Sequence, residues 1–213
     1  MKVLITAGPT REYIDPVRFI SNASSGKMGY LLAEIIHAAK NEVILISGQV
    51  NITPPRGIKP VYVTSTNQMY SMVMKHINSC DIFISAAAVC DYTAETKARN
   101  KLKKTGKNLK LNLIPAKDII REAGNKLIKS KTRDKKLLIG FALETENLVK
   151  NAVNKLTAKS LDMIIANSHK SINNDMTKLV IITKSGIIYK TKKITKKEAA
   201  KAIWKKIKSC LRK

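Results

Sequence analysis

The feature that most constrains the fold is an alternation of short apolar, β-branched runs with longer stretches of helical periodicity. The first run, Lys2–Thr6, ends at a glycine turn, and a helical pattern over Met28–Ala39 follows. Further strands are expected at Val43–Ser47, Val61–Thr64, Asp81–Ala86, Leu137–Phe141 and Met163–Asn167, and further helices at Thr66–Ile77, Asp118–Lys129 and Glu146–Lys159. Strands separated by helices predict βαβ units with right-handed crossovers. We therefore predict a three-layer, doubly wound, mostly parallel α/β sheet of the Rossmann-like kind.

The last part of the chain departs from this alternation. Leu179–Thr183 and Ile187–Lys190 flank a Lys-Ser-Gly turn, which predicts a C-terminal hairpin. Lys196–Leu211 has apolar residues at helical spacing and predicts a closing helix. The middle segment, Thr93–Lys110, is rich in lysine and poor in large apolar residues, so we expect a mobile loop there. A short strand is expected after it, at Leu109–Leu113.

Length and composition favour an ordinary globular protein. The chain has 213 residues without a linker or repeat, so we expect a single domain over residues 1–213. The cysteines, Cys80, Cys90 and Cys210, are widely spaced and include no CxxC pair. This spacing argues against a disulfide framework and a structural zinc site. No apolar run approaches the roughly 18 residues needed to cross a bilayer. We expect a cytoplasmic protein without a membrane partner.

The net charge of +25 is abnormal and has two interpretations. Lysines that neutralise phosphates would suit a basic nucleic-acid-binding protein on an α/β scaffold. However, the lysines are spread over the whole chain and aromatic residues make up only 5% of it. Few aromatics mean few stacking platforms, so specific nucleic-acid binding is not expected. Solvated lysine faces, with some attraction for anionic ligands, remain the other interpretation.

The most informative stretch runs from Thr6 to Gly29, between the first expected strand and its helix. It contains Ser24-Ser25-Gly26-Lys27-Met28-Gly29, which places small residues, two hydroxyls and a lysine at a helix start. Such a turn can bind a phosphate through free amides and the helix dipole. Plain N-capping by a serine is the alternative. The glycine spacing matches neither a Walker A loop nor the dinucleotide fingerprint, which argues against a NAD-dependent Rossmann oxidoreductase.

Several strings resemble the phosphopantothenate–cysteine ligases, the ligase part of the bacterial coenzyme A biosynthesis bifunctional protein. They are, in order, ITAGPTRE and DPVRFISNASSGKMG near the start, SAAAVCDY at Ser85–Tyr92, NKLKK at Asn100–Lys104, GFALET at Gly140–Thr145, and two lysines before a D-x-I-x-A-N segment at Asp162–Asn167. The strings agree in order and spacing over nearly the whole chain, so coincidence is a poor explanation.

The resemblance implies a two-step synthesis of 4′-phosphopantothenoylcysteine. The carboxylate of 4′-phosphopantothenate would attack the α-phosphate of CTP, releasing pyrophosphate and leaving an acyl-cytidylate. The amine of L-cysteine would then attack the acyl carbon and expel CMP. CTP is expected rather than ATP because the match is to the bacterial type. Magnesium is expected as a cofactor because the phosphates need charge neutralisation, yet neither a carboxylate cluster nor His37, His76 and His169 identify its ligands.

The resemblance also assigns residues. Asn22 would hold the acyl oxyanion, Arg18 would bind the pantothenate phosphate, and Lys101 would lie on a mobile loop that closes over the triphosphate. Phosphopantothenate would be bound by Arg18, Asn22, Ser24, Ser25, Gly26, Ala87 and Ala88. The nucleotide would be bound by Ser85, Ala86, Ala87, Asp91, Lys101, Lys117, Asp118, Ile119, Ile120, Phe141, Lys155 and Lys159. Without the resemblance, Asn22 could be a turn residue and Arg18 and Lys101 solvated charges.

The chain departs from the family pattern in two places. Residues 93–100 do not align clearly, and Lys117 stands before Asp118 where the family has proline. Family members form dimers with segments of one subunit near the site of the other, so a homodimer is expected. The chain has no decarboxylase segment and is expected to be a free-standing ligase or the ligase half of a fused or associated enzyme.

Overall fold

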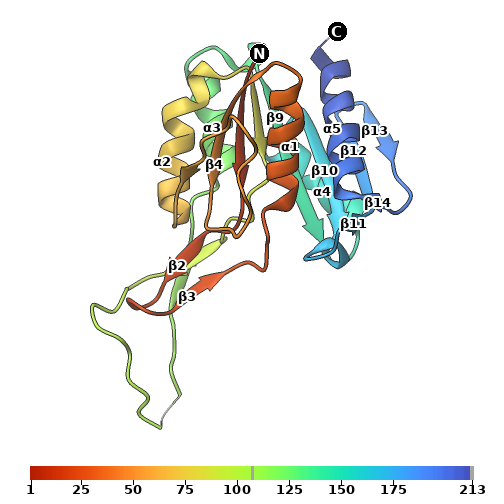
Figure 1. Cartoon of the computed structure of the whole chain (residues 1–213). Coiled ribbons are helices and arrows are strands. Elements are labelled where there is room, and N and C mark those ends of the chain that lie inside the picture. The colour runs from red at the N-terminus through yellow and green to blue at the C-terminus, as the bar shows by residue number, and fades with distance from the viewer. Residues whose placement is uncertain (107, 212–213) are drawn as a thin grey trace.

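The centre of the molecule is an eight-stranded sheet of order β13-β12-β10-β9-β6-β1-β4-β5 (Figure 1). The computed structural model describes residues 1–106 and 108–211. The strands are β1 (Lys2–Ala7), β4 (Glu42–Ser47), β5 (Val61–Tyr62), β6 (Ile82–Ser85), β9 (Leu137–Glu144), β10 (Met163–Ser168), β12 (Leu179–Thr183) and β13 (Gly186–Lys190). Pairing is parallel from β5 to β10 and antiparallel for β12 and β13. The mostly parallel sheet and the C-terminal hairpin are therefore confirmed.

Helices cover both faces of the sheet and complete three layers. The longer helices are α1 (Lys27–Ala38), α2 (Thr66–His76), α3 (Ile119–Lys129), α4 (Leu148–Ala158) and α5 (Lys196–Leu211), and the short 3-10 turns are η1 (Ile77–Ser79), η2 (Arg133–Lys135) and η3 (His169–Ser171). Buried side chains of α1 and α5 share one apolar cluster, and those of α2, α3 and α4 share the other. Within residues 1–106 and 108–211, no helix combines the length and apolar character that crossing a bilayer requires.

The strand order reverses between β1 and β6. From β1 the chain continues to β4 and β5 on one side, and from β6 it continues to β9 and β10 on the other. In open α/β sheets, ligands bind outside the carboxyl ends of the strands at such a switch point. The fold therefore predicts a ligand site next to the ends of β1 and β6.

Three two-stranded ribbons were not predicted from the sequence. They are β2 (Arg11–Tyr13) with β3 (Phe19–Ser21), β7 (Tyr92–Ala94) with β8 (Leu113–Pro115), and β11 (Met176–Thr177) with β14 (Ile194–Thr195). Figure 1 shows the segment between β7 and β8 extending away from the sheet beyond β2 and β3.

The expected strand at Leu109–Leu113 is wrong in its position, because β8 begins only at Leu113. Leu113 pairs with Ala94, the last residue of β7. The ladder continues by one hydrogen bond, from Glu95 N to Asn112 O (3.0 Å), before the two segments separate. Within the described residues, no strand lies opposite residues 109–111, and a strand needs a partner for its backbone groups.

A buried carboxylate ties the ribbons to the main body. Glu12 of β2 is only 3% exposed. Its Oε1 accepts a hydrogen bond from Thr66 N at the start of α2 (2.7 Å), and its Oε2 accepts one from Thr93 Oγ1 of β7 (2.8 Å). A carboxylate at a helix N-terminus is favoured by the helix dipole. Glu12 therefore positions both ribbons against α2.

Candidate active site

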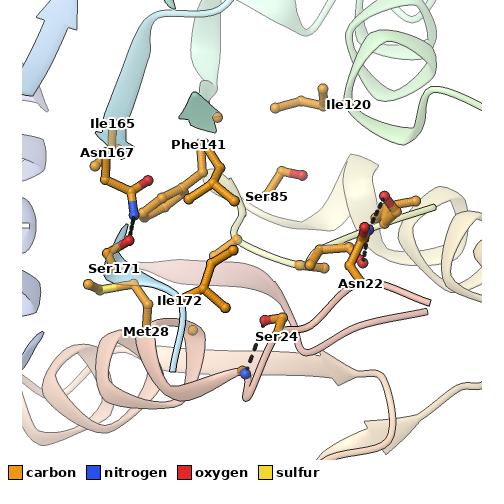
Figure 2. A pocket seen from close by; sticks show the side chains of 18 of the residues that line it. Asn22, Ser24, Met28, Ser85, Ile120, Phe141, Ile165, Asn167, Ser171 and Ile172 are labelled. Carbon is orange, nitrogen blue, oxygen red and sulfur yellow. Dashed lines mark hydrogen bonds between the residues drawn. The ribbon is translucent and has the colours of Figure 1, made fainter. Parts of the chain in front are cut away.

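A cavity of about 600 Å³ lies at the switch point. This volume is within the usual range for small-molecule sites. The predicted site residues that line it are Asn22, Ser24, Ser25, Gly26, Ser85, Ala86, Ala87, Ala88, Asp91, Lys117, Asp118, Ile119, Ile120, Phe141, Lys155 and Lys159. They come from the segment after β3, the end of β6 and the segment after it, the segment after β8 with the start of α3, strand β9, and the C-terminal part of α4. Figure 2 shows Asn22 at one end of the cavity and Asn167 and Ser171 at the other, with Ser85 and Phe141 between them.

The N-terminus of α1 opens into this cavity. Its N-cap residue, Gly26, has φ +77°, which L side chains rarely adopt. Ser24 Oγ accepts a hydrogen bond from Gly26 N (3.2 Å), and Ser25 Oγ accepts a longer one from Lys27 N (3.4 Å). Gly26 has no side chain that could cap the helix, and the first turn has no acidic residue. The positive end of the helix dipole is thus available to an anionic ligand.

Gly29 sets how closely α1 approaches the sheet. A Cβ on Gly29 would lie 2.5 Å from the Ala7 Cβ and 3.1 Å from the Ala7 Cα. Only glycine allows the first turn of the helix to pack this near the end of β1. The close packing places the turn beside the cavity.

Asn22 is held by the segment that follows β6. Its Nδ2 donates to the carbonyl oxygens of Ala88 (3.1 Å) and Val89 (2.9 Å). Two acceptors opposite the same nitrogen fix the orientation of the amide, because a flipped amide would bring three oxygens together. Both amide hydrogens are therefore used, and Oδ1 is the atom left to contact a ligand. An oxyanion contact from Nδ2 would require these bonds to be exchanged.

The two lysines of the α4 region differ in their surroundings. Lys155 Nζ donates to Phe141 O (2.9 Å). Burial lowers the pKa of Lys155, and the nearby positive charge of Lys159 lowers it further. Lys159 Nζ forms an ion pair with Asp118 Oδ2 (2.9 Å). Asp118 also caps α3 by accepting from Arg121 N (3.3 Å). Among the described residues Lys155 forms no ion pair, and the more distant charges of Glu144, Asp91 and Asp118 only partly offset the effect of burial on its pKa.

Lys117 lines the cavity, but its ammonium lies over the ring of Tyr70, 4.2 Å from the centroid. This cation–π contact holds the side chain toward α2. The neighbouring backbone is stabilised by a hydrogen bond from Ala116 N to Asp91 O (2.8 Å). The segment that carries Lys117 to Ile120 therefore presents backbone atoms to the cavity at a defined position.

Arg18 and Lys101 lie outside the cavity, unlike the other predicted site residues. Arg18 Nη1 donates to Asp15 Oδ2 (2.7 Å) and to Leu102 O (2.9 Å). Lys101 is exposed on the segment between β7 and β8. The two residues are thus neighbours through Leu102, at the base of the segment between β7 and β8.

Sequence reasoning left several cavity residues unassigned. They include Asn167, Ser171, Asn173, Thr177 and Lys196. Asn167 could have been found, because it lies near the end of β10 just as Ser85 lies at the end of β6. Lys196 could not have been found, because it is one of 40 lysines and arginines with no local motif around it.

The cavity residues do not form a metal centre. Among residues 1–106 and 108–211, no group of three or more histidine, cysteine, aspartate or glutamate side chains is placed to hold a metal ion. Of the cavity carboxylates, Asp118 is already paired with Lys159. Hard cations need several oxygen ligands, so the protein alone does not fit a resident magnesium site.

The fold and the cavity together define a doubly wound α/β protein with a cavity at the switch point of its sheet whose helix N-terminus and lysines suit an anionic ligand. The chain belongs to the family of the DNA/pantothenate metabolism flavoprotein C-terminal domain, whose model matches residues 1–211. This membership confirms the resemblance to the ligase part of the coenzyme A biosynthesis bifunctional protein that the sequence motifs indicated.

Similar proteins agree with this assignment. The chain is 41% identical over 189 residues to the coenzyme A biosynthesis bifunctional protein CoaBC of Haemophilus influenzae, covering 87% of this chain and 46% of that protein. It is 42% identical over 211 residues to a cysteine/cysteine sulfinic acid decarboxylase of an unknown prokaryotic organism, covering 97% and 57%. The chain thus spans about half the length of these curated relatives. The crystal structure of the C-terminal domain of a CoaBC protein matches with a TM-score of 0.82 at 37% identity, covering 99% of this chain and 95% of that one.

Proposed function

We propose that this chain, as one ligase domain, joins 4′-phosphopantothenate to L-cysteine with CTP as the activating nucleotide. The observation that carries the proposal is that one cavity contains both the open N-terminus of α1 and, across the ends of the strands, Lys155 and Lys159. A phosphorylated acid and a nucleotide can therefore occupy one cavity with their reacting groups near each other. Its family membership, with a name that includes pantothenate metabolism, supports this choice of substrate.

In the first step, an oxygen of the substrate carboxylate attacks the α-phosphorus of CTP, and the bond to the leaving pyrophosphate breaks. Lys155 would neutralise phosphate charge, because the residue is half-buried and its ammonium group donates to a carbonyl oxygen and forms no ion pair within the described residues. Backbone groups of Ser85–Ala88 and Lys117–Ile120 would hold the nucleotide, because small side chains at the end of β6 let a ligand approach the main chain. Magnesium would enter with the CTP phosphates, in keeping with the lack of a protein carboxylate cluster in the described chain.

In the second step, the amine nitrogen of cysteine attacks the acyl carbon, the bond to CMP breaks, and the amine loses a proton. Asn22 lies beside Ala88 and Val89 and has its Oδ1 free of its own backbone contacts. We assign to Asn22 the positioning of the incoming amine or, after exchange of its hydrogen bonds, of the acyl oxyanion. Exclusion of water during this step would protect the mixed anhydride from hydrolysis.

Arg18 and Lys101 would act by holding the segment between β7 and β8 over the cavity. Lys101 would reach the triphosphate only after the segment between β7 and β8 moves, or from a second copy of the chain in a homodimer. Apolar side chains exposed on β7 and on the segment between β7 and β8, here called the arm, support self-association: Tyr92 is 55% and Leu109 60% exposed. Arg18, bonded to Leu102, would carry the arm with it. Light scattering of the purified protein measures whether the dimer forms.

The test of the function is pyrophosphate release from 4′-phosphopantothenate and magnesium, comparing CTP with ATP, each with and without L-cysteine. We expect release with CTP that requires the phosphorylated acid and turns over only when cysteine is present. Unphosphorylated pantothenate serves as the matched control substrate. No release with either nucleotide would reject the ligase proposal. Release that depends on ATP alone would retain the ligase and reject CTP. No structural observation favours the nucleic-acid-binding or NAD-dependent alternatives.

A further inference from the structure

Lys196 is a largely buried lysine at the edge of the cavity. It is the first residue of α5, is only 9% exposed, and lines the same cavity near Thr177 and Leu179. Its backbone N donates to Asp175 O (2.8 Å). Within the described part of the chain its ammonium group forms no ion pair, although the carboxylate of Asp175 is near enough to favour the charged form. Burying a positive charge is costly unless negative groups compensate it, and an anionic ligand would add to the partial compensation from Asp175.

A second ammonium group lies in electrostatic reach of the first. Lys27 begins α1, lines the cavity, and forms an ion pair with Asp175. Burial lowers the pKa of Lys196, and the positive charge of Lys27 lowers it further. Two lysines thus share the single carboxylate of Asp175, which is 79% exposed. The pair retains an excess of positive charge facing the cavity.

The first turn of α1 adds hydrogen-bond donors at the same place. Met28 and Gly29 both line the cavity, and the helix has neither a side-chain cap nor an acidic residue in this turn. The first amides of a helix have no partner within the helix. Converging amides and ammonium groups suit the three acceptor oxygens of a phosphate.

We propose that Lys196, together with Lys27 and the first amides of α1, forms a phosphate-binding subsite at this end of the cavity. The subsite rests on the proposed function only for the source of the phosphate, which is either the terminal phosphates of the nucleotide or the phosphate of the pantothenate substrate. Asp175 forms an ion pair with Lys27 when no phosphate is bound, and a bound phosphate would replace Asp175 as the partner of Lys27.

The experiment is calorimetric titration of the purified chain and its Lys196→Met variant with inorganic pyrophosphate, CTP, CMP, 4′-phosphopantothenate and pantothenate. The matched control is Lys197→Met, which removes the same charge from the adjacent, exposed position. Methionine keeps the length of the side chain, and removal of a charged hydrogen-bond donor should weaken binding by roughly tenfold. We expect that loss for pyrophosphate in Lys196→Met, with little change in Lys197→Met.

The other ligands identify the source. Weaker binding of CTP with unchanged CMP assigns the subsite to the terminal phosphates. Weaker binding of 4′-phosphopantothenate with unchanged pantothenate assigns it to that substrate. Asp175→Asn should act in the opposite direction and tighten pyrophosphate binding, because Lys27 loses its competing partner.

Equal affinities of wild type and Lys196→Met for all phosphorylated ligands would overturn the subsite. This result is distinct from failure of the proposed function. If wild type binds neither CTP nor 4′-phosphopantothenate but binds pyrophosphate through Lys196, the ligase proposal falls and the subsite stands. If wild type binds no phosphorylated ligand, pyrophosphate included, the subsite is overturned as well.

Discussion

Asp15 and Arg18 form a clamp on the arm that carries Lys101. Arg18 Nη1 lies 2.7 Å from Asp15 Oδ2 and donates to Leu102 O (2.9 Å), and Leu102 N donates to the same Asp15 oxygen (3.1 Å). Asp15 is only 2% exposed. Burial alone would raise the pKa of Asp15, but backbone donors at Val17, Arg18 and Leu102 and the charge of Arg18 lower it below its ordinary value. The β2–β3 turn thus anchors the base of the arm.

Asp15→Asn should release this anchor. The amide cannot accept at full strength from four donors, so the Leu102 amide should exchange its hydrogen roughly tenfold faster, in line with the loss of charged hydrogen bonds. Exchange measured by mass spectrometry or NMR tests this. Asp134→Asn, at an exposed position in η2, is the control and should leave Leu102 unchanged. Unchanged exchange in Asp15→Asn would show that the arm is held by other contacts. Because the folded pKa is lowered, this stabilisation is present above the ordinary pKa of 3.8 and is lost as the pH falls through the folded value.

Asn22→Asp should separate the two chemical steps. A carboxylate oxygen would replace Nδ2 opposite the carbonyls of Ala88 and Val89, which now accept at 3.1 and 2.9 Å. We expect pyrophosphate release from CTP to continue but amide formation to fall by about a hundredfold, because a carboxylate facing two carbonyl oxygens would turn away, and a displacement of about 1 Å of a positioning group can cost this much. Quenched-flow assays of pyrophosphate and product measure the two steps. Asn67→Asp adds the same charge at an exposed position of α2 and is the control. Normal coupling to cysteine in Asn22→Asp would remove Asn22 from the mechanism.

Gly29→Ala should destabilise the fold and weaken phosphate binding together. The added methyl would lie 2.5 Å from the Ala7 Cβ, so α1 must move away from β1. Overpacking of this kind lowers the free energy of unfolding by about 1–3 kcal/mol. Gly124→Ala, whose methyl would meet only the end of the Leu138 side chain at 3.3 Å, should be neutral or stabilising by up to about 1 kcal/mol. Urea unfolding compares the two variants, and equal stabilities would refute the close-packing argument.

Nucleotide affinity should be lost at a lower alkaline pH than it would be if the binding lysines were exposed. The pKa values of Lys155 and Lys196 lie below the ordinary 10.5, chiefly because burial disfavours the charged form. An anion binds the protonated forms, so affinity is present at neutral pH and is lost as the pH rises through these lowered values. Calorimetric titration with CTP between neutral and alkaline pH measures the profile. The same profile in a Lys155→Met, Lys196→Met double variant would contradict the assignment.

The sequence by itself determined the elements of the sheet and most of the cavity lining. Short apolar runs between helical patterns define β1, β4, β6, β9 and β10, because periodicity is a local property of the chain. Residues at the carboxyl ends of such parallel strands meet at one edge of the sheet. Ser85 and Phe141 therefore line one cavity, whereas Asn22 reaches it from the segment after β3, a strand that the sequence did not predict.

Only the tertiary structure decided the features that depend on contacts between residues far apart in the sequence. The arm starts its strand late because β7 ends at Ala94 and offers no partner to residues 109–111. Arg18 contacts Asp15 and Leu102 rather than the cavity. Lys196, one basic residue among 40 in the sequence, is the one that α5 buries beside Lys27 and Asp175. Burial and pairing of a charge depend on residues distant in sequence, and local patterns carry no information about them.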